Sequence, residues 1–474
     1  MKAVSRRSFL QAALAASAFP LLPVHGAFGR DKVRLACVGV GQQAWHDIQQ
    51  FSKTGFCEVV ALCDTDIANG KQCNGAKKKF PKVPRFSDFR KMLDAMDGKI
   101  DAVAVMNPDF SHFPALMAAM KRGLGVFSEK PLAHTFEECE LLMAAEKKYG
   151  VVTQMGNQGH SGENYYQFKE YVEKGIIDIS KLTRLCAHMN SARRWHKWNG
   201  NVTAFPDFER TVKGEVSKMT PGLDWDTWTG TATPHAYSKD YVQGEWRSWF
   251  DFGNGALGDW GAHTMDTMHR FFELGLPTEV IIKDVTGWNP FVFPMQDTLN
   301  FKFAAKGKRP SCLLEWYEGV KNLPRLPKGH KSAAWDASIP QAGGSSGSAK
   351  SKSLNPGKFF ELSNGDVWFG GSHSSQLDKA GVDRKDLPKW RKNGSNHYAN
   401  FLLSVMGKEK TRSPFSVTGP LSEVFCLGCI AQRLNRGFKF DPATKQIVGD
   451  AEANALLKGS KGTPRKGWEE FYRV

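Results

Sequence analysis

The sequence predicts an α/β protein in which a doubly wound parallel sheet precedes an α+β domain with an open, mainly antiparallel or mixed sheet. Short apolar runs alternate with helical segments from residue 33 to residue 157, and a glycine-rich turn joins the first run to the first helical segment. Beyond residue 275, strand-like runs follow one another without that alternation. The 474 residues, 41% hydrophobic and 24% charged, are typical of a globular protein of two or three domains.

Residues 1–30 have the features of an export signal: a basic start, an apolar run from Phe9 to Leu22, and small residues near Ala27. The stretch Ser5-Arg6-Arg7-Ser8-Phe9-Leu10 resembles the twin-arginine motif, which directs folded proteins to export. The apolar run is too short to span a bilayer, and no transmembrane segment is expected after it. We therefore expect a periplasmic or secreted protein, with an ordinary amphipathic first helix as the alternative.

Charge and cysteine content exclude several classes of site. The net charge of +16 is spread along the chain without a nucleic-acid-binding motif, so no nucleic-acid partner is expected. Nine cysteines form no disulfide framework. Cys426 and Cys429 have the spacing of a redox or zinc half-site, but they lie in a helical segment with no second pair nearby. Core packing is favoured for both, and no metal site is predicted.

The order of segments after the signal predicts a first domain over residues 31–155. Strand-like runs are expected at residues 33–41, 56–64, 100–108, 123–131 and 151–157. Helical segments are expected at residues 42–55, 66–80, 87–96, 111–123 and 134–150. Strands that alternate with helices form parallel sheets with right-handed crossovers.

The first strand-to-helix turn, Gly39-Val40-Gly41-Gln42-Gln43-Ala44, has the GxGxxA pattern of a dinucleotide-binding Rossmann domain. The first glycine permits a tight turn, and the second lets the backbone approach a pyrophosphate at the helix N-terminus. Asp64 ends the second strand-like run, placed to accept hydrogen bonds from the adenosine ribose. A carboxylate there would repel a 2′-phosphate, so NAD is the expected cofactor.

Three further motifs carry a family resemblance. Glu129-Lys130-Pro131 follows the fifth expected strand, Asn107-Pro108-Asp109-Phe110-Ser111-His112 follows the fourth, and Asp259-Trp260-Gly261-Ala262-His263 has DxxxH spacing. In this order, after a Rossmann fingerprint, they resemble the EKP motif, the nicotinamide loop and the catalytic motif of the Gfo/Idh/MocA oxidoreductases. The resemblance covers nearly all of the chain after residue 33, most closely up to residue 275.

The resemblance implies catalytic roles for Lys130, Asp259 and His263. Oxidation of a secondary alcohol needs a base for the hydroxyl proton, and His263 is the candidate, with Asp259 one helical turn earlier on the same face. Lys130 is implied at the junction of nicotinamide and substrate. Core packing is the alternative for His263. The residues expected to bind the cofactor are Gly39, Gly41, Gln42, Gln43, Asp64, Asn107, Pro108, His112, Glu129, Lys130 and Asn157.

Residues 156–474 are expected to form a substrate-binding α+β domain. The stretch 156–161, GNQGHS, departs from the family's usual arginine-bearing loop, and its His160 is either a substrate contact or part of a helix-capping loop. An insert at about 190–250 holds Trp195, Trp198, Trp225, Trp228, Trp246 and Trp249, whose rings either stack on sugar rings or, for most of them, pack a core. Trp228 and Arg247 are the candidate substrate contacts there. Residues 341–352 read as a flexible Gly/Ser insertion.

Export and a dinucleotide together constrain the predicted chemistry. No pool of soluble NAD is maintained outside the cytoplasm, so the cofactor is expected to stay bound and to be regenerated in each cycle. One possibility is an oxidoreductase that returns the hydride to a second sugar or carbonyl compound. The other is an NAD-dependent glycoside hydrolase, which oxidises one carbon transiently, eliminates the glycosidic substituent, adds water and re-reduces.

The glycoside hydrolase would need a further base, for which His160, Tyr165 and Tyr237 are candidates. A non-catalytic sugar-binding protein with structural NAD is the third alternative, disfavoured because nothing would then require Lys130, Asp259 and His263 together. The expected partner is a small-molecule carbohydrate, and the family resemblance implies a homo-oligomer, a dimer or a tetramer.

Overall fold

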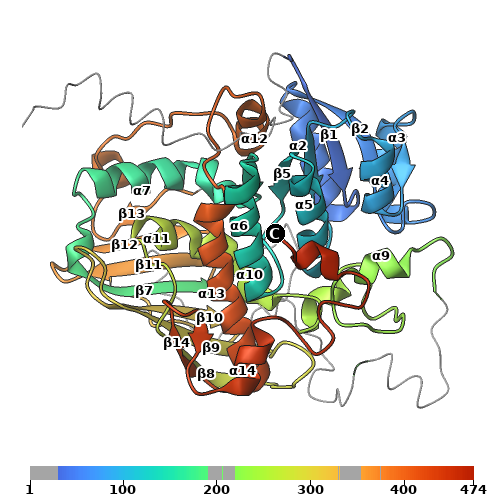
Figure 1. Cartoon of the computed structure of the whole chain (residues 1–474). Coiled ribbons are helices and arrows are strands. Elements are labelled where there is room, and N and C mark those ends of the chain that lie inside the picture. Colours follow the sequence, from blue (N-terminus) through green and yellow to red (C-terminus); the bar gives the residue numbers. More distant parts are fainter. Residues whose placement is uncertain (1–29, 191–204, 206–218, 329, 331–353, 374) are drawn as a thin grey trace, which may run out of the picture.

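The computed structural model describes residues 30–190, 205, 219–328, 330, 354–373 and 375–474 (Figure 1). The export signal expected over residues 1–30 lies outside this range except for Arg30, and so does the Gly/Ser insertion at 341–352. Of the insert's tryptophans, Trp195 and Trp198 also fall outside it. No helix among the described residues is both long and apolar enough to cross a membrane.

The first sheet is parallel throughout and has six strands in the order β3-β2-β1-β4-β5-β6. Its strands are β1 (Val33–Val38), β2 (Cys57–Cys63), β3 (Arg85–Phe86), β4 (Ala102–Val105), β5 (Gly125–Ser128) and β6 (Thr153–Met155). This is the doubly wound sheet that the sequence predicts. Only β3 was not expected, because a strand of two residues is too short to show an alternation of apolar and polar side chains. The chain order reverses between β1 and β4, where such sheets bind ligands.

Helices connect these strands as expected, namely α2 (Gln42–Lys53), α3 (Asn74–Lys79), α4 (Phe89–Ala95), α5 (His112–Lys121) and α6 (Phe136–Tyr149). Helix α6 illustrates how the local sequence determines where a helix begins and ends. Thr135 and Glu138 form a reciprocal capping box at its start, and Gly150 ends it with a left-handed φ of 63°.

Among the described residues, the second sheet has nine strands in the order β13-β12-β11-β7-β10-β9-β8-β14-β15, and only β7 and β10 pair in parallel. The strands are β7 (Leu182–Met189), β8 (Glu279–Thr286), β9 (Gln296–Phe303), β10 (Cys312–Glu318), β11 (Gly357–Leu362), β12 (Val367–Gly371), β13 (Asp378–Lys379), β14 (Phe438–Asp441) and β15 (Gln446–Ile447). The expectation of a mixed, mainly antiparallel sheet is therefore confirmed.

Helices from both halves of the chain meet beside this sheet, where α6, α10 and α13 lie together (Figure 1). The helices that the structure describes in the second half are α7 (Glu163–Glu173), α9 (Trp225–Thr229), α10 (Gly255–Thr264), α11 (Asp266–Phe271), α12 (His397–Val405), α13 (Phe415–Leu434) and α14 (Ala451–Leu456). Short 3-10 turns are η1 (Lys71–Cys73), η2 (Asp109–Ser111), η3 (Gln158–Ser161), η4 (Ile179–Lys181), η6 (Glu245–Ser248), η7 (Arg384–Asp386) and η8 (Glu469–Tyr472). All nine cysteines are free, and Cys426 and Cys429 lie on α13.

Helix α12 returns to the first sheet after more than two hundred residues of intervening chain (Figure 1). Its Phe401 is fully buried, with ring centroids 6.2 Å from Phe51 of α2 and 5.8 Å from Phe127 of β5. Tyr398 meets Phe51 edge-on at 5.0 Å. One side of the nucleotide-binding sheet is therefore closed by a helix that the sequence places in the other domain.

We expect Phe401→Ala to lower the free energy of unfolding by about 3–5 kcal/mol, because it removes a buried ring and leaves a cavity. Urea unfolding followed by fluorescence measures this change. Lys408→Ala, at an exposed position just after the same helix, is the matched control and should change stability by less than about 0.5 kcal/mol. Equal effects of the two substitutions would contradict a packing role for α12.

Candidate active site

The glycine turn after β1 adopts the geometry that the sequence predicts. Gly39 has a φ of +81°, and a Cβ there would lie 2.7 Å from backbone atoms of Met106 and Asn107. A Cβ on Gly41 would lie 2.5 Å from the side chain of Gln72. Helix α2 starts at Gln42 with no side-chain cap, which leaves its first N–H groups available to an anion.

A first cavity of about 150 Å³ extends from this turn along the ends of β1 and β2. Two carboxylates, those of Asp64 and Asp66, lie on its wall. Asp64 accepts hydrogen bonds from the backbone N–H groups of Val40 and Asp66, both at 3.0 Å. The Oδ1 atom of Asp66 is buried and has no hydrogen-bond partner among the described residues. These features fit an adenosine ribose and disfavour a 2′-phosphate.

The second cavity, of about 870 Å³, lies at the carboxyl ends of β4 and β5 and continues toward the second domain. Residues of both domains line it, as expected for a ligand site at the switch point of a doubly wound sheet. They are Gln42, Gln43, His46, Gln50, Met106, Asn107, Asp109, His112, Glu129, Lys130, Gln158, Gln243, Gly244, Glu245, Arg247, Asp259, Trp260, His263, His373 and Tyr398.

Lys130 and Asp259 form an ion pair across the two domains. The Nζ atom of Lys130 donates to Asp259 Oδ1 at 2.6 Å and to the Asp259 carbonyl oxygen at 3.0 Å. Lys130 follows β5 and Asp259 lies on α10, and their side chains are only 12% and 9% exposed. The ammonium group therefore has a fixed position and still borders the cavity.

His263 lies one turn after Asp259 on α10 and borders the same cavity. Burial holds its pKa well below the usual value, and the positive charge of Lys130 lowers it further. The Nδ1 atom is buried and has no hydrogen-bond partner among the described residues. A neutral imidazole in this place can accept a proton.

Two residues expected to bind the cofactor, His112 and Glu129, are buried and have shifted pKa values. The nitrogens of His112 lie 2.9 Å from the Pro131 carbonyl oxygen and 2.8 Å from that of Asn107, so the ring ties two loops together. Burial lowers the pKa of His112 to about 4. Burial and the neighbouring Asp47 raise the pKa of Glu129 well above its usual value.

Asn157 and His160 lie behind the cavity and do not line it. Asn157 is fully buried, and neither polar atom of its side chain has a hydrogen-bond partner among the described residues. His160 is also fully buried, with Nε2 2.7 Å from the carboxylate of Asp266 and Nδ1 2.9 Å from the Arg412 carbonyl oxygen. Of the two roles expected for His160, a substrate contact or part of a capping loop, neither is tested by these internal contacts, which place the ring away from the second cavity.

The candidate substrate contacts from the tryptophan insert separate into two places. Arg247 borders both cavities and lies over the ring of Trp246 at 4.2 Å. Trp228 lines the first cavity only, and it stacks on Trp225 at 4.3 Å. The ring of Trp228 therefore faces the expected dinucleotide site rather than the cavity that holds His263.

Sequence reasoning assigned no role to Asp109 and His373, both of which line the second cavity. Asp109 is almost fully buried; burial raises its pKa, and the nearby Arg247 opposes this rise. It lies inside the loop motif after β4, so the motif itself was the available signal. His373 lies on the loop after β12, where no sequence pattern marks it.

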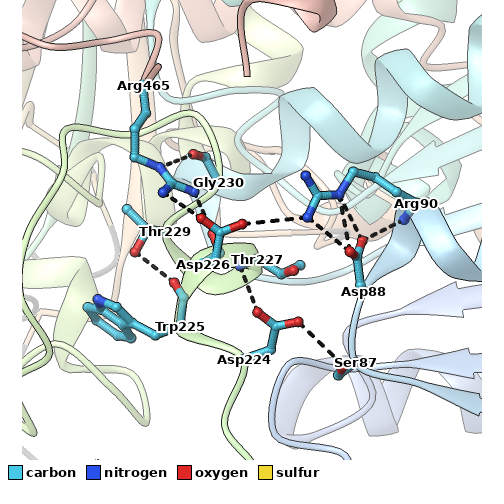
Figure 2. A network of polar contacts seen from close by, with 10 residues as sticks. All are labelled: Ser87, Asp88, Arg90, Asp224, Trp225, Asp226, Thr227, Thr229, Gly230 and Arg465. Atoms are coloured by element: carbon cyan, nitrogen blue, oxygen red, sulfur yellow. Dashed lines mark hydrogen bonds and ion pairs between the residues drawn. The ribbon is translucent and has the colours of Figure 1, made fainter. Parts of the chain in front are cut away.

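A polar network fastens the insert to the first domain over the first cavity (Figure 2). Asp224 accepts from Ser87 Oγ at 3.4 Å, and its backbone N–H donates to the Thr65 carbonyl oxygen at 2.9 Å. Asp226 pairs with Arg90 at 3.6 Å and with Arg465 at 2.6 Å. We call Ser87, Asp88, Arg90, Asp224, Trp225, Asp226, Thr227, Thr229, Gly230 and Arg465 the clasp.

Family models match both domains of the chain. Residues 33–157 match the oxidoreductase family's NAD-binding Rossmann fold, and residues 197–290 match its C-terminal alpha/beta domain. The chain belongs to the Gfo/Idh/MocA oxidoreductase family. The first domain of this family member is an NAD-binding domain, and its glycine turn and carboxylates fit that cofactor.

Curated relatives match only part of this chain. An inositol 2-dehydrogenase of Klebsiella pneumoniae is 31% identical over 170 residues, which cover 35% of this chain and 44% of the relative. An alpha-N-acetylgalactosaminidase of Shewanella oneidensis is 29% identical over 227 residues, which cover 43% and 48%. The chain thus spans less than half the length of these relatives.

Solved structures share the fold of this chain at low sequence identity. The WlbA dehydrogenase of Chromobacterium violaceum, in complex with NADH and UDP-GlcNAcA, has a TM-score of 0.57 at 15% identity, covering 87% of this chain and 97% of the other. An aldose-aldose oxidoreductase of Caulobacter crescentus has a TM-score of 0.54 at 13% identity, covering 86% and 100%. At such identities the likeness concerns the fold alone.

We expect Gly39→Ala to weaken NAD binding and to destabilise the protein, because the added Cβ meets the backbone of Met106 and Asn107. Gly55→Ala is the matched control: its φ of +77° imposes the same left-handed strain, about 1–2 kcal/mol, but a Cβ there has no atom within 4 Å. Calorimetric NAD titration and urea unfolding compare them. Equal losses would mean that strain, and not the close approach, fixes Gly39.

Proposed function

We propose that the protein transfers a hydride between a hydroxyl-bearing carbon of a carbohydrate and an NAD molecule that stays bound through the cycle. The observation that carries this proposal is the convergence of Lys130, Asp259 and His263 on one cavity at the carboxyl ends of β4 and β5. A cation, a carboxylate and a neutral imidazole side by side supply what carbinol oxidation requires of a protein.

The three residues divide the proton chemistry among them. His263 takes the hydroxyl proton as the carbonyl group forms and returns it when the carbonyl group is reduced. Lys130 stabilises the negative charge that develops on the oxygen, and Asp259 holds the ammonium in place through the 2.6 Å ion pair. NAD, when bound, supplies the hydride acceptor, and its reduced form is the hydride donor to the final carbonyl compound.

Enclosure by the insert supports a retained cofactor. Leu223, Trp228 and Trp246 line the first cavity opposite Asp64 and Asp66, so the insert covers the part of the site that fits adenosine. The clasp fixes the insert there from two directions (Figure 2). Export by the twin-arginine pathway to a periplasmic or extracellular location is part of the proposal, because it would carry out a protein already folded around its cofactor.

A carbohydrate substrate is proposed from the chemistry of the cavity and the names of the relatives. Asp109, Arg247 and Trp260 border the second cavity beside the ion pair, which combines hydroxyl-binding groups with an apolar ring face. The relatives are named for a cyclic polyol and for a glycoside. A homo-oligomer remains proposed on the family resemblance.

Redox-neutral cleavage of a glycoside is the second candidate function. A specific observation favours it: a second imidazole, that of His373, borders the cavity beside His263. The alpha-N-acetylgalactosaminidase relative, at 29% identity, is consistent with it. The two candidates share the first oxidation step. They differ in whether the carbon beside the oxidised one then loses a proton and the substituent on the following carbon leaves.

We expect purified protein to contain NAD that survives dialysis and to show the absorbance of reduced nicotinamide after mixing with a substrate from a panel of free sugars and glycosides. His263→Ala should lose this signal by at least about 100-fold while keeping its NAD content, since only proton transfer is removed. Stopped-flow absorbance and chromatography of the released cofactor measure the two quantities. Native protein that binds a sugar without any reduced nicotinamide would support the sugar-binding alternative instead.

If the clasp retains the cofactor, weakening the clasp should speed the release of NAD. Arg465→Ala removes hydrogen bonds to Asp226 and to the Gly230 carbonyl oxygen, and we expect it to raise the NAD dissociation rate roughly tenfold. Exchange of resident NAD against labelled NAD measures the rate. Arg436→Ala, which breaks ion pairs with Asp450 and Glu452 outside the clasp, is the control and should leave the rate unchanged. Equal rates in native protein and Arg465→Ala would rule out retention by the clasp.

A further inference from the structure

We infer that His373 is the second acid–base group of this site and serves the carbon beside the one that is oxidised. The inference rests on the proposed function and deepens it: it assigns glycosides, or other sugars with a leaving group two carbons away from the oxidised carbon, as the substrate class. The inference is based on two observations: the position of the His373 ring, and the difference in burial between His373 and His263.

His373 is held against His263 by several contacts. Its backbone N–H donates to the His263 carbonyl oxygen at 3.2 Å, and the two rings stack with centroids 3.8 Å apart and an interplanar angle of 19°. Trp260 meets both rings edge-on at 5.8 Å. Nδ1 lies 2.9 Å from Ser372 Oγ, and His373 lines the second cavity. The residue adopts a left-handed φ of 57°, a conformation found at functional sites in non-glycine residues.

The other candidate bases are less well placed. Tyr165 packs on His160 and Tyr237 on Trp225, and none of His160, Tyr165 and Tyr237 lines the second cavity. His112 lines it, but both of its nitrogens face backbone carbonyl oxygens. His46 lines it from the exposed side of α2. His373 is therefore the imidazole that stands beside His263.

The proton balance of eliminative cleavage requires two such groups. While the carbonyl exists, the hydroxyl proton stays on His263, so that imidazole has no further lone pair for a second proton. His373 then takes the proton from the carbon beside the carbonyl group; the C–H electrons form a double bond to the next carbon along as the C–O bond on that next carbon breaks. His373 gives the same proton to the departing oxygen, and water adds by the reverse path. Adjacent carbons lie about 1.5 Å apart, so rings stacked at 3.8 Å can serve both.

The environment keeps both imidazoles able to accept protons. Burial lowers the pKa of His373, and the positive charges of Lys130 and Lys358 lower it further against the opposing charge of Asp259. The same two lysines face His263. His263 is 7% exposed, whereas His373 is only half-buried on its loop. A proton on His373 can therefore exchange with solvent while the one on His263 is sheltered.

The test is deuterium uptake by the full chain with its resident NAD. Native protein in deuterium oxide, given the methyl glycosides from the panel, should place deuterium on the carbon beside the oxidised one in recovered sugar. His373→Phe keeps a ring on His263 without nitrogens. We expect it to lose deuterium uptake by at least about 100-fold and to retain single-turnover formation of reduced nicotinamide. Mass spectrometry and stopped-flow absorbance measure the two.

Two companion variants guard against a folding artefact. His373→Ala should regain deuterium uptake when imidazole is added, which a misfolded protein cannot do. Ser375→Ala, in the same loop, should behave as native protein.

Three results would overturn the assignment: undiminished uptake in His373→Phe, equal loss of both signals, which would make the ring a positioning residue for His263, or no uptake by native protein that does form reduced nicotinamide. Failure of the proposed function itself looks different, because native protein would then form no reduced nicotinamide with any sugar.

Discussion

The ion pair between Lys130 and Asp259 joins the two domains at the point where chemistry is proposed. Lys130 follows the end of β5 and Asp259 lies on α10, and both side chains are largely buried from water. A buried charge without its partner is costly, so neither domain can keep its half of the pair in this position alone. The packing of α10 and α6 against α13 sets the distance between the two backbones. His263 takes its place from the same helix, one turn beyond Asp259.

The cofactor site is likewise assembled from distant parts of the chain. Its floor is the glycine turn and the ends of β1 and β2, and its cover is the insert that contains Leu223, Trp228 and Trp246. The cover is attached by residues from three regions of the sequence, near Arg90, Asp226 and Arg465 (Figure 2). Individual exposed ion pairs contribute little, and here the attachment depends on several hydrogen bonds acting on one short helix.

Local signals made the nucleotide domain predictable, and also the group of residues Lys130, Asp259 and His263 that meets at one cavity. Three kinds of feature can be recognised from a few consecutive residues: a glycine that the backbone geometry requires, a short buried strand and a carboxylate at a strand end. Gly39 and Asp64 are examples. No such local pattern identifies His373, because its proximity to His263 is set by the pairing of β11 and β12 within the second sheet. His160 illustrates the converse. Its sequence context was equally compatible with a capping loop, and only its contact with Asp266 shows that it faces inward. The tryptophans behave similarly, since an aromatic-rich insert gives no indication of which cavity it covers.

The return of α12 to the first sheet limits how this molecule can be divided. Sequence alone places a boundary near residue 155, yet Phe51 and Phe127 are covered by Phe401, which lies far beyond it. A fragment cut at that boundary would expose an aromatic surface and be prone to aggregate. Anyone exchanging nucleotide domains among relatives would have to transplant residues 397–406 together with residues 31–155. Evolution faces the same restriction: a recombination event that respects only the linear boundary would separate two halves of one hydrophobic core.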